Sequence, residues 1–459
     1  MIKESKFYEE NFDSPENLAD SILKEYKNNV GKITFPINPF KILNELDVKI
    51  VVANFSKLEG LFSPSKDIED IDLVAINNNE NSNIYRQRFT AAHEICHVIK
   101  DRNNITYCNK FGQKNNIEKF ADNFAAFLLM PTKELNKQID KITNGKKYIK
   151  IENIINISEY FGVSFESCVY QIAYHLKRIN GDIDKDTLKK RIGQAKPKTL
   201  RKNLEYNNEI QLKREFIDSI YFGRPYMDYA STIKFRQYLL FHENRLEGNN
   251  INEHELNYIM ADLRLNNDYE KYSSTRDKNI IEAIGNIEMI EYVLSTEEKI
   301  SVWKISKLQK ILYKYTRFGK ELPFPRQANN RITGAEISTV DYHDIPNELL
   351  KIDKKINMLL DNKDNTNVHE YILECLKIHH RLTVIHPLED GNGRCLRAFL
   401  IWLLRAKGLP PIYYDSDVKN EYKKSLNMID KNNDYNQLEV LTINQMLKSI
   451  SIIDKVYYK

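Results

Sequence analysis

The feature that most constrains the fold of this chain is a change in apolar periodicity near residue 117. Before about residue 105, a helical start (LADSILKEY, 18–26) is followed by the β-branched runs VKIVVANF (48–55) and DIDLVAI (70–76), which are typical of strands. Beyond residue 117, apolar residues recur at three- and four-residue spacing, which is the pattern of helices. The sequence therefore predicts an α+β part followed by a mainly α-helical part.

The length of the chain requires more than one core. A chain of 459 residues is too long for one ordinary domain. The stretch GDIDKDTLKKRIGQAKPKTLRK loses apolar periodicity and gains charge, as a linker or an exposed helix would. We expect a solvated basic linker at 181–209, in preference to a nucleic-acid contact. It separates a domain at 1–180, with a helical tail at 150–180, from a second domain at 210–459.

Charge and cysteine content narrow the class of protein. Lys and Arg number 68 against 64 Asp and Glu, which argues against general polyanion binding. The five cysteines show no paired spacing typical of a disulfide framework or a zinc ribbon, and a reducing compartment fits. The first residues contain no apolar h-region, and no stretch approaches the roughly 20 apolar residues of a membrane span. We expect a cytoplasmic protein that binds neither membrane nor nucleic acid.

A candidate zinc site lies in the stretch RFTAAHEICHVIK. His93 and His97 are four residues apart on a predicted helix, so both imidazoles leave one face and can share a metal ion, with Glu94 beside them. Zinc catalysis with this pattern needs a third protein ligand and an open fourth position where water is activated. Glu118 opens the next helix and is our candidate third ligand. Asp122, one turn later, can accept a hydrogen bond from the second ring nitrogen of a ligand histidine and so hold that ring in place. The alternative is a core helix whose two histidines are surface or capping residues.

The stretch RFTAAHEICHVI, followed by EKFADNFAAFLLMP (118–131), resembles the ImmA/IrrE family of metallopeptidases. The resemblance covers about residues 30–180. It implies a zinc-dependent endopeptidase in which the two histidines and Glu118 hold the metal and Glu94 activates the water. Members of the family often cut a repressor protein. The family commonly has a second Glu and then Ala-Asn where this chain has Phe-Ala-Asp at 120–122.

The string HPLEDGNGRCLR (386–397) connects two predicted helices and carries a candidate phosphate site. Gly391 and Gly393 let backbone N–H groups at a helix N-terminus approach an anion closely. Arg394 can contact the outer phosphates, and Arg397, three residues later on the same helix face, can reach the same region. Two arginines at one helix start suggest a polyphosphate.

Two further side chains of this loop can supply the chemistry. Asp390 is the best candidate to hold Mg²⁺ between phosphate oxygens, because this hard cation prefers oxygen ligands. His386, at the loop entrance, has an unperturbed pKa range suited to taking a proton from an attacking hydroxyl near neutral pH. The alternative is a glycine turn between core helices whose charges lie in solvent.

The same string resembles the Fic signature H-P-F-x-D/E-G-N-G-R-x-x-R at every position except Leu388. The resemblance covers about residues 210–450. It implies transfer of AMP from Mg-ATP to a protein hydroxyl with release of pyrophosphate, with His386 as the base and Asp390 on Mg²⁺. The residues that it assigns to phosphate oxygens are Asn392, Gly393 and Arg394, with Arg397 on the γ-phosphate.

Two other stretches resemble accessory parts of Fic proteins. HENRLEGNN (242–250) is similar to the inhibitory motif S/T-x-x-x-E-G/N: Glu247 and the glycine after it match, and Glu243 replaces the Ser/Thr. A carboxylate paired with Arg397 would remove the cation that the γ-phosphate needs. The alternative is a helix that ends in a glycine cap. NNRITGAEIST (329–339) lies where Fic proteins carry a flap that aligns the target backbone.

Together these patterns predict a protein adenylyltransferase fused to a zinc endopeptidase, acting as a stress, toxin or phage-response regulator. The expected cofactors are Zn²⁺ and Mg²⁺, with ATP as substrate. The expected partners are protein substrates of both activities, and self-modification and oligomerisation are further options. Two alternatives stay open: a nucleotide- and metal-binding sensor without turnover, and Fic-type transfer of a different phosphate-containing group.

Overall fold

The chain divides into two compact units, Met1–Tyr221 and Phe222–Lys459. The structure is a computed structural model. The described residues are 14–65, 71–79, 82–101, 105–109, 115–179, 184–206, 208–220, 229–273, 275, 277–316, 322–332 and 338–454. Within them, no helix is both long enough and apolar enough to cross a membrane.

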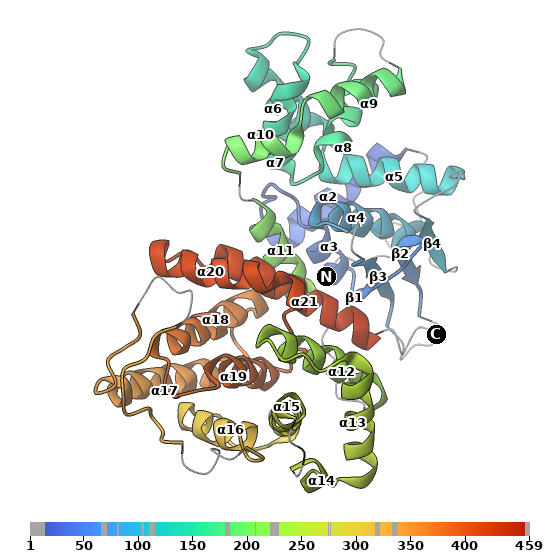
Figure 1. Cartoon of the computed structure of the whole chain (residues 1–459). Helices are drawn as coiled ribbons and strands as arrows, with labels where there is room; N and C mark the ends of the chain where they lie inside the picture. Colours follow the sequence, from blue (N-terminus) through green and yellow to red (C-terminus); the bar gives the residue numbers. More distant parts are fainter. Residues whose placement is uncertain are drawn as a thin grey trace. The chain divides into compact units, whose positions relative to one another are not determined.

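The described part of the first unit contains one four-stranded mixed sheet, in the order β1-β3-β2-β4 (Figure 1). Its strands are β1 (Lys49–Ala53), β2 (Leu58–Ser63), β3 (Leu73–Asn77) and β4 (Thr106–Asn109). β1 runs parallel to β3, whereas β2 is antiparallel to both β3 and β4. β1 and β3 are the two runs that the sequence predicted. β2 and β4 carry weaker patterns because one contains a glycine and the other has only four residues.

The other described elements of the first unit are helices. They are α2 (Pro15–Val30), α3 (Pro39–Glu45), α4 (Ile84–Lys100), α5 (Asn116–Leu129), α6 (Thr132–Thr143), α7 (Ile154–Phe161), α8 (Phe165–Tyr170), α9 (Lys185–Gln194), α10 (Pro197–Asn203) and α11 (Asn208–Ser219), with the short helices η1 (Ile151–Asn153) and η2 (Gln171–His175). α4 packs against β2, β3 and β4 on one side and contacts α3 and α5. Every residue from Thr90 to Ile99 is buried, so the segment with both predicted metal-binding histidines is held on several sides.

Residues 181–209, which we predicted to be a linker, lie within the first unit. Their described part forms α9, α10 and the start of α11. The Asp184 side chain caps α9 by accepting two backbone N–H groups at its start. Only Leu188 and Ile192 of α9 are buried, and α10 buries none of its residues. So narrow a packed face explains why the stretch shows little apolar periodicity.

All regular secondary structure in the described part of the second unit is helical (Figure 1). Its helices are α12 (Tyr229–Leu246), α13 (Glu253–Asn266), α14 (Glu270–Ser273), α15 (Lys278–Ser295), η3 (Val302–Lys304), α16 (Ile305–Leu312), α17 (Ile345–Asp361), α18 (Val368–Ile385), α19 (Asn392–Ala406), η4 (Ser416–Val418), α20 (Lys419–Asn432) and α21 (Asn436–Asp454). α19 contacts α15, α16 and α18, and every residue from Arg394 to Leu404 is buried. The predicted fold class, an α+β part followed by a mainly helical part, is confirmed.

Candidate functional sites

Helices α4 and α5 bring together the three side chains predicted to bind zinc. The Nε2 atoms of His93 and His97 lie 3.1 Å apart. Each of them lies 3.4 Å from a carboxylate oxygen of Glu118. Two ligands of a tetrahedral zinc ion, with bonds of about 2.0–2.2 Å, are separated by about 3.4 Å. The spacing of the three groups therefore suits one shared cation.

Each histidine also contacts a second carboxylate through its Nδ1 atom, and this contact orients the imidazole ring. His93 Nδ1 lies 3.0 Å from Asp122 Oδ1, and His97 Nδ1 lies 2.7 Å from Asp101 Oδ2. When both Nδ1–H groups donate to these carboxylates, the two Nε2 atoms direct lone pairs at each other, which a cation between them stabilises. These residues thus fit a divalent metal ion. We did not predict Asp101, although it lies one helical turn after His97.

The carboxylates also set the protonation of this cluster. Burial alone would lower the pKa of His97, but its hydrogen bonds to Asp101 and Glu118 outweigh burial and raise the pKa to about 9. Burial would raise the pKa of Glu118, but hydrogen bonds with both histidines outweigh it and hold the pKa at about 2. The negative charge that favours a proton between these groups equally favours a divalent cation.

Glu94 is fully buried beside the two histidines. Neither of its carboxylate oxygens has a hydrogen-bond partner among the described residues, and burial raises its pKa to about 7. A Cβ atom at Gly60 of β2 would lie 2.5 Å from Glu94 Oε1, so the glycine leaves room for this carboxylate. Buried polar groups are normally hydrogen-bonded. The free carboxylate of Glu94 therefore marks a position where a polar molecule can bind.

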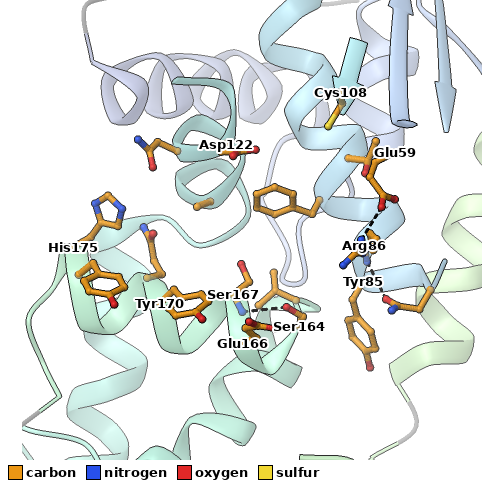
Figure 2. A pocket seen from close by; sticks show the side chains of 18 of the residues that line it. Glu59, Tyr85, Arg86, Cys108, Asp122, Ser164, Glu166, Ser167, Tyr170 and His175 are labelled. Atoms are coloured by element: carbon orange, nitrogen blue, oxygen red, sulfur yellow. Dashed lines mark hydrogen bonds and ion pairs between the residues drawn. The ribbon is translucent and has the colours of Figure 1, made fainter. Parts of the chain in front are cut away.

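A cavity of about 820 Å³ borders the candidate metal centre (Figure 2). Cys108 and Asp122 line it, and Asp122 is the partner of His93, so the cavity begins at the cluster itself. Figure 2 shows Tyr170 and His175 on the wall away from Cys108. The wall also carries hydroxyl and carboxylate groups, supplied by Ser164, Glu166 and Ser167. Such a mixed lining can hold a peptide through both apolar and polar contacts.

In the second unit, the loop between α18 and α19 holds the residues predicted to bind phosphate. Gly391 is the N-cap of α19 with φ 80°, and a Cβ atom there would lie 2.9 Å from the Tyr313 ring. Both the backbone conformation and the lack of space require glycine. Asp390 Oδ1 accepts the Gly391 N–H at 2.7 Å. His386 is the C-cap of α18, and burial lowers its pKa.

Arg326 fixes the entrance of this loop. Its Nε donates to the carbonyl oxygen of His386 at 2.8 Å, and its backbone N–H donates to that of Pro387 at 2.9 Å. Its Nη2 donates to the carbonyl oxygen of Val340 at 2.5 Å. No sequence motif indicated this buried arginine. Of the predicted flap at 329–339, residues 333–337 lie outside the described residues.

The side chain of Asn392 holds the loop from inside. It accepts the Leu388 N–H at 3.1 Å and donates to the Leu388 carbonyl oxygen at 2.8 Å. Leu388, which stands where the Fic signature has Phe, is completely buried. Both polar atoms of the Asn392 side chain thus make hydrogen bonds within the loop, and one N–H of its amide is left over for the phosphate contact that the resemblance implies.

Arg394 is buried and already has partners. Its Nη1 lies 3.1 Å from Glu282 Oε2, and its Nη2 donates to the Tyr313 hydroxyl at 3.1 Å. Its Nε has no hydrogen-bond partner in the described part of the chain. Glu282 and Tyr313 come from α15 and the end of α16 and were not predicted. They hold the guanidinium beside the start of α19. There its Nε–H can donate a hydrogen bond to an incoming phosphate.

Two carboxylates hold Arg397. Its Nε donates to both oxygens of Glu243, at 3.0 and 2.8 Å, and its Nη2 donates to Glu247 Oε1 at 2.7 Å. Burial raises the pKa of Glu243. Burial would also raise the pKa of Glu247, but the charge of Arg397 outweighs it and lowers that pKa. A Cβ atom at Gly393 would lie 2.5 Å from Glu247 Oε1, so this glycine permits the approach. Sequence reasoning gave Glu243 no role, because the related motif has a hydroxyl residue there.

Comparison with known families gives each unit a class. Residues 44–173 match the IrrE N-terminal-like domain, and residues 299–404 match the Fic/DOC family. The two matches lie in the two units and include both candidate sites, HEICH in the first and HPLEDGNGRCLR in the second. The chain thus contains an IrrE N-terminal-like peptidase-family domain followed by a Fic domain.

Individual relatives match the chain in part. Protein adenylyltransferase Fic of Nematostella vectensis is 26% identical over 244 residues, which are 51% of this chain and 52% of the relative. Protein adenylyltransferase fic-1 of Caenorhabditis elegans is 31% identical over 67 residues, which are 15% of this chain and 13% of the relative. The matches therefore span about half of the first relative and less of the second. A solved structure of Fic-1 from C. elegans aligns with TM-score 0.40 and 15% identity, covering 80% of this chain and 98% of that one.

Proposed function

We propose that this chain is a protein adenylyltransferase that moves AMP from Mg-ATP to a protein hydroxyl, fused to a zinc endopeptidase. The observation that carries the proposal is the loop at 386–397. It ends in a glycine-capped helix N-terminus, and two buried arginines, Arg394 and Arg397, follow on one face of that helix. Backbone N–H groups and guanidinium groups in this arrangement bind phosphates.

In the proposed reaction, His386 is the general base. Because burial lowers its pKa, the imidazole is neutral near pH 7 and can accept a proton. The target hydroxyl loses that proton to His386 as its oxygen bonds to the α-phosphorus. The bond from the α-phosphorus to the bridging oxygen then breaks, and pyrophosphate leaves. Mg²⁺ held by Asp390 would neutralise phosphate charge, and Arg394 would bind phosphate oxygens.

The contacts of Arg397 correspond to an inhibited form of this enzyme. Glu243 and Glu247 occupy the guanidinium that the γ-phosphate would otherwise contact. A triphosphate that lacks this contact is not held with its α-phosphate facing the target hydroxyl. Control of this contact, by the peptidase domain or by a partner, would suit a regulator that acts in stress, toxin or phage responses.

In the first unit, we propose peptide hydrolysis. His93, His97 and Glu118 would hold zinc, which acts as a Lewis acid on the scissile carbonyl and on water. Asp122 and Asp101 keep both imidazoles turned to the metal. Glu94 would take a proton from the attacking water and return it to the leaving amine, and its raised pKa suits both steps. The adjoining cavity would hold the peptide on either side of the bond that is cut.

The assay for the Fic reaction compares ATP labelled at the α-phosphate with ATP labelled at the γ-phosphate, in the presence of Mg²⁺. We expect protein to take up the α-label only, because pyrophosphate carries the γ-label away. The assay includes the Glu243→Gln/Glu247→Gly protein, in which Arg397 is free. Uptake of the γ-label would indicate phosphorylation. Saturable ATP binding with no uptake of either label would favour the sensor without turnover.

We expect about one zinc ion per chain, because three ligands leave a single catalytic position. Metal analysis of the dialysed full-length protein measures it. The His93→Ala/His97→Ala protein should lose the zinc. Glu94→Gln should keep the zinc yet lose peptide cleavage, because Glu94 moves protons and does not hold the metal. His175→Ala, a change in the same cavity but outside the cluster, is the matched control for zinc content. Unchanged zinc in the double-histidine protein would disprove the ligand assignment.

A further inference from the structure

A thiol lies at the candidate metal centre. Cys108 is on β4, the edge strand of the described sheet, directly opposite Gly60 of β2. Opposed residues of paired strands point to the same face of a sheet. A Cβ atom at Gly60 would contact Thr90 and Glu94 of α4, so the Cys108 side chain also points toward α4. It is only 6% exposed.

The sulfur of Cys108 belongs to a second group of potential ligands, which shares only His93 with the group of the proposed zinc ligands. One metal-binding atom each of His93, Glu94 and Cys108 all lie within 4.8 Å of one another. His93 also belongs to the group that contains His97 and Glu118, so the thiol adjoins the proposed zinc ligands. Figure 2 shows Cys108 on the cavity wall near Glu59. Cys168, fully buried in the same unit, belongs to no such group among the described residues.

The carboxylate of Glu94 provides an independent sign of a ligand at this point. It is completely buried, it lies within the Cys108 group, and neither of its oxygens has a hydrogen-bond partner within the described chain. The two groups share His93, so two imidazoles, two carboxylates and a sulfur gather at the inner end of the cavity. A cation among such electron-rich, largely buried groups stabilises them.

We propose that Cys108 is a fourth protein ligand of the zinc ion and closes the position where water would otherwise bind. This inference rests on the proposed zinc site. On binding, the Cys108 thiol gives its proton to solvent, a sulfur–zinc bond forms, and a water molecule leaves the metal. Thiolate is a preferred zinc ligand. Two histidines, a glutamate and a thiolate make a closed set typical of structural zinc. The peptidase is then latent until Cys108 leaves the metal, so the cleavage lost in Glu94→Gln is measured in proteins that also carry Cys108→Ala.

The test uses Co²⁺ in place of zinc in the full-length protein, because a cobalt–thiolate bond adds an intense near-ultraviolet charge-transfer band to the visible bands of tetrahedral cobalt. We expect the parent protein to show both. Cys108→Ala should keep the visible bands, lose the ultraviolet band and bind zinc about tenfold more weakly or worse, since even outer contacts contribute about 10–100-fold. Cys168→Ala, which removes another buried thiol of the first unit, should match the parent.

The outcomes separate this inference from the zinc site itself. Visible bands without the thiolate band in the parent, or an unchanged thiolate band in Cys108→Ala, would exclude Cys108 as a ligand and leave the zinc site standing. Cobalt binding that survives His93→Ala/His97→Ala would instead overturn the site. If Cys108→Ala does not fold, zinc X-ray absorption of the parent decides: a sulfur neighbour at about 2.3 Å supports the inference. A shell of nitrogen and oxygen alone contradicts it.

Discussion

Replacement of His386 by alanine is expected to reduce AMP transfer by about 10²–10⁴-fold, the usual contribution of a general base. ATP binding should persist, because the phosphate contacts come from the start of α19 and not from His386. The change is made in the Glu243→Gln/Glu247→Gly protein, so that inhibition does not mask the loss. Single-turnover uptake of α-labelled ATP measures the rate, and isothermal titration measures nucleotide affinity.

The pH dependence of the same rate supplies a second readout. Burial lowers the pKa of His386 below its usual value of 6.5. The neutral imidazole is the active form, so transfer should rise with pH and level off before neutrality. The acid limb of the profile should therefore lie below pH 6.5. His254→Ala, which removes an exposed histidine of α13, is the matched control and should leave the profile unchanged. Parental transfer in His386→Ala would remove this residue from the mechanism.

Sequence periodicity predicts those parts of the fold in which one element has a strong apolar pattern of its own. The two helices predicted on either side of the loop HPLEDGNGRCLR are α18 and α19. β2 and β4 are weaker cases. Gly60 interrupts β2 because Glu94 needs the space, and β4 is stabilised by pairing with β2 and not by its own four residues. Contacts with residues distant in the sequence determine the secondary structure of such segments.

The same distinction applies to the sites. His93 and His97 are predictable because four residues make about one helical turn, and the structure does place their Nε2 atoms together. Local spacing cannot reveal partners that distant segments supply. Glu243 reaches Arg397 across 154 positions, and Arg326 reaches His386 across 60. Glu243 also differs from the hydroxyl residue of the related motif, so the resemblance concealed its contact with the arginine.

Full release of Arg397 is expected to require the loss of both carboxylates. Glu247→Gly removes the contact with Nη2 but leaves Nε bonded to Glu243, so AMP transfer should rise only in part. A hydrogen bond to a charged group contributes about 1.5–3 kcal/mol, which corresponds to about 10–150-fold. We expect about tenfold from Glu247→Gly and at least about 100-fold from Glu243→Gln/Glu247→Gly. Uptake of α-labelled ATP at equal protein and Mg²⁺ concentrations measures both.

Removal of both carboxylates leaves the buried guanidinium of Arg397 without a counter-charge, which typically costs about 3–5 kcal/mol. The double variant should therefore melt at a lower temperature than the parent. ATP should raise its melting temperature more than that of the parent, because the γ-phosphate takes the place of the carboxylates. Glu421→Gln, a charge-neutralising change at an exposed position of α20, controls for general loss of charge and should alter neither transfer nor melting.

Each result of this series has a distinct meaning. Equal transfer by Glu247→Gly and the double variant would leave Glu243 with a packing role only. No increase in the double variant, with folding and ATP binding intact, would mean that residues 242–250 form a capped helix without inhibitory function. Adding His386→Ala to the double variant should abolish the gain, because freeing Arg397 improves only the placement of the phosphates. The target hydroxyl still needs a base to take its proton.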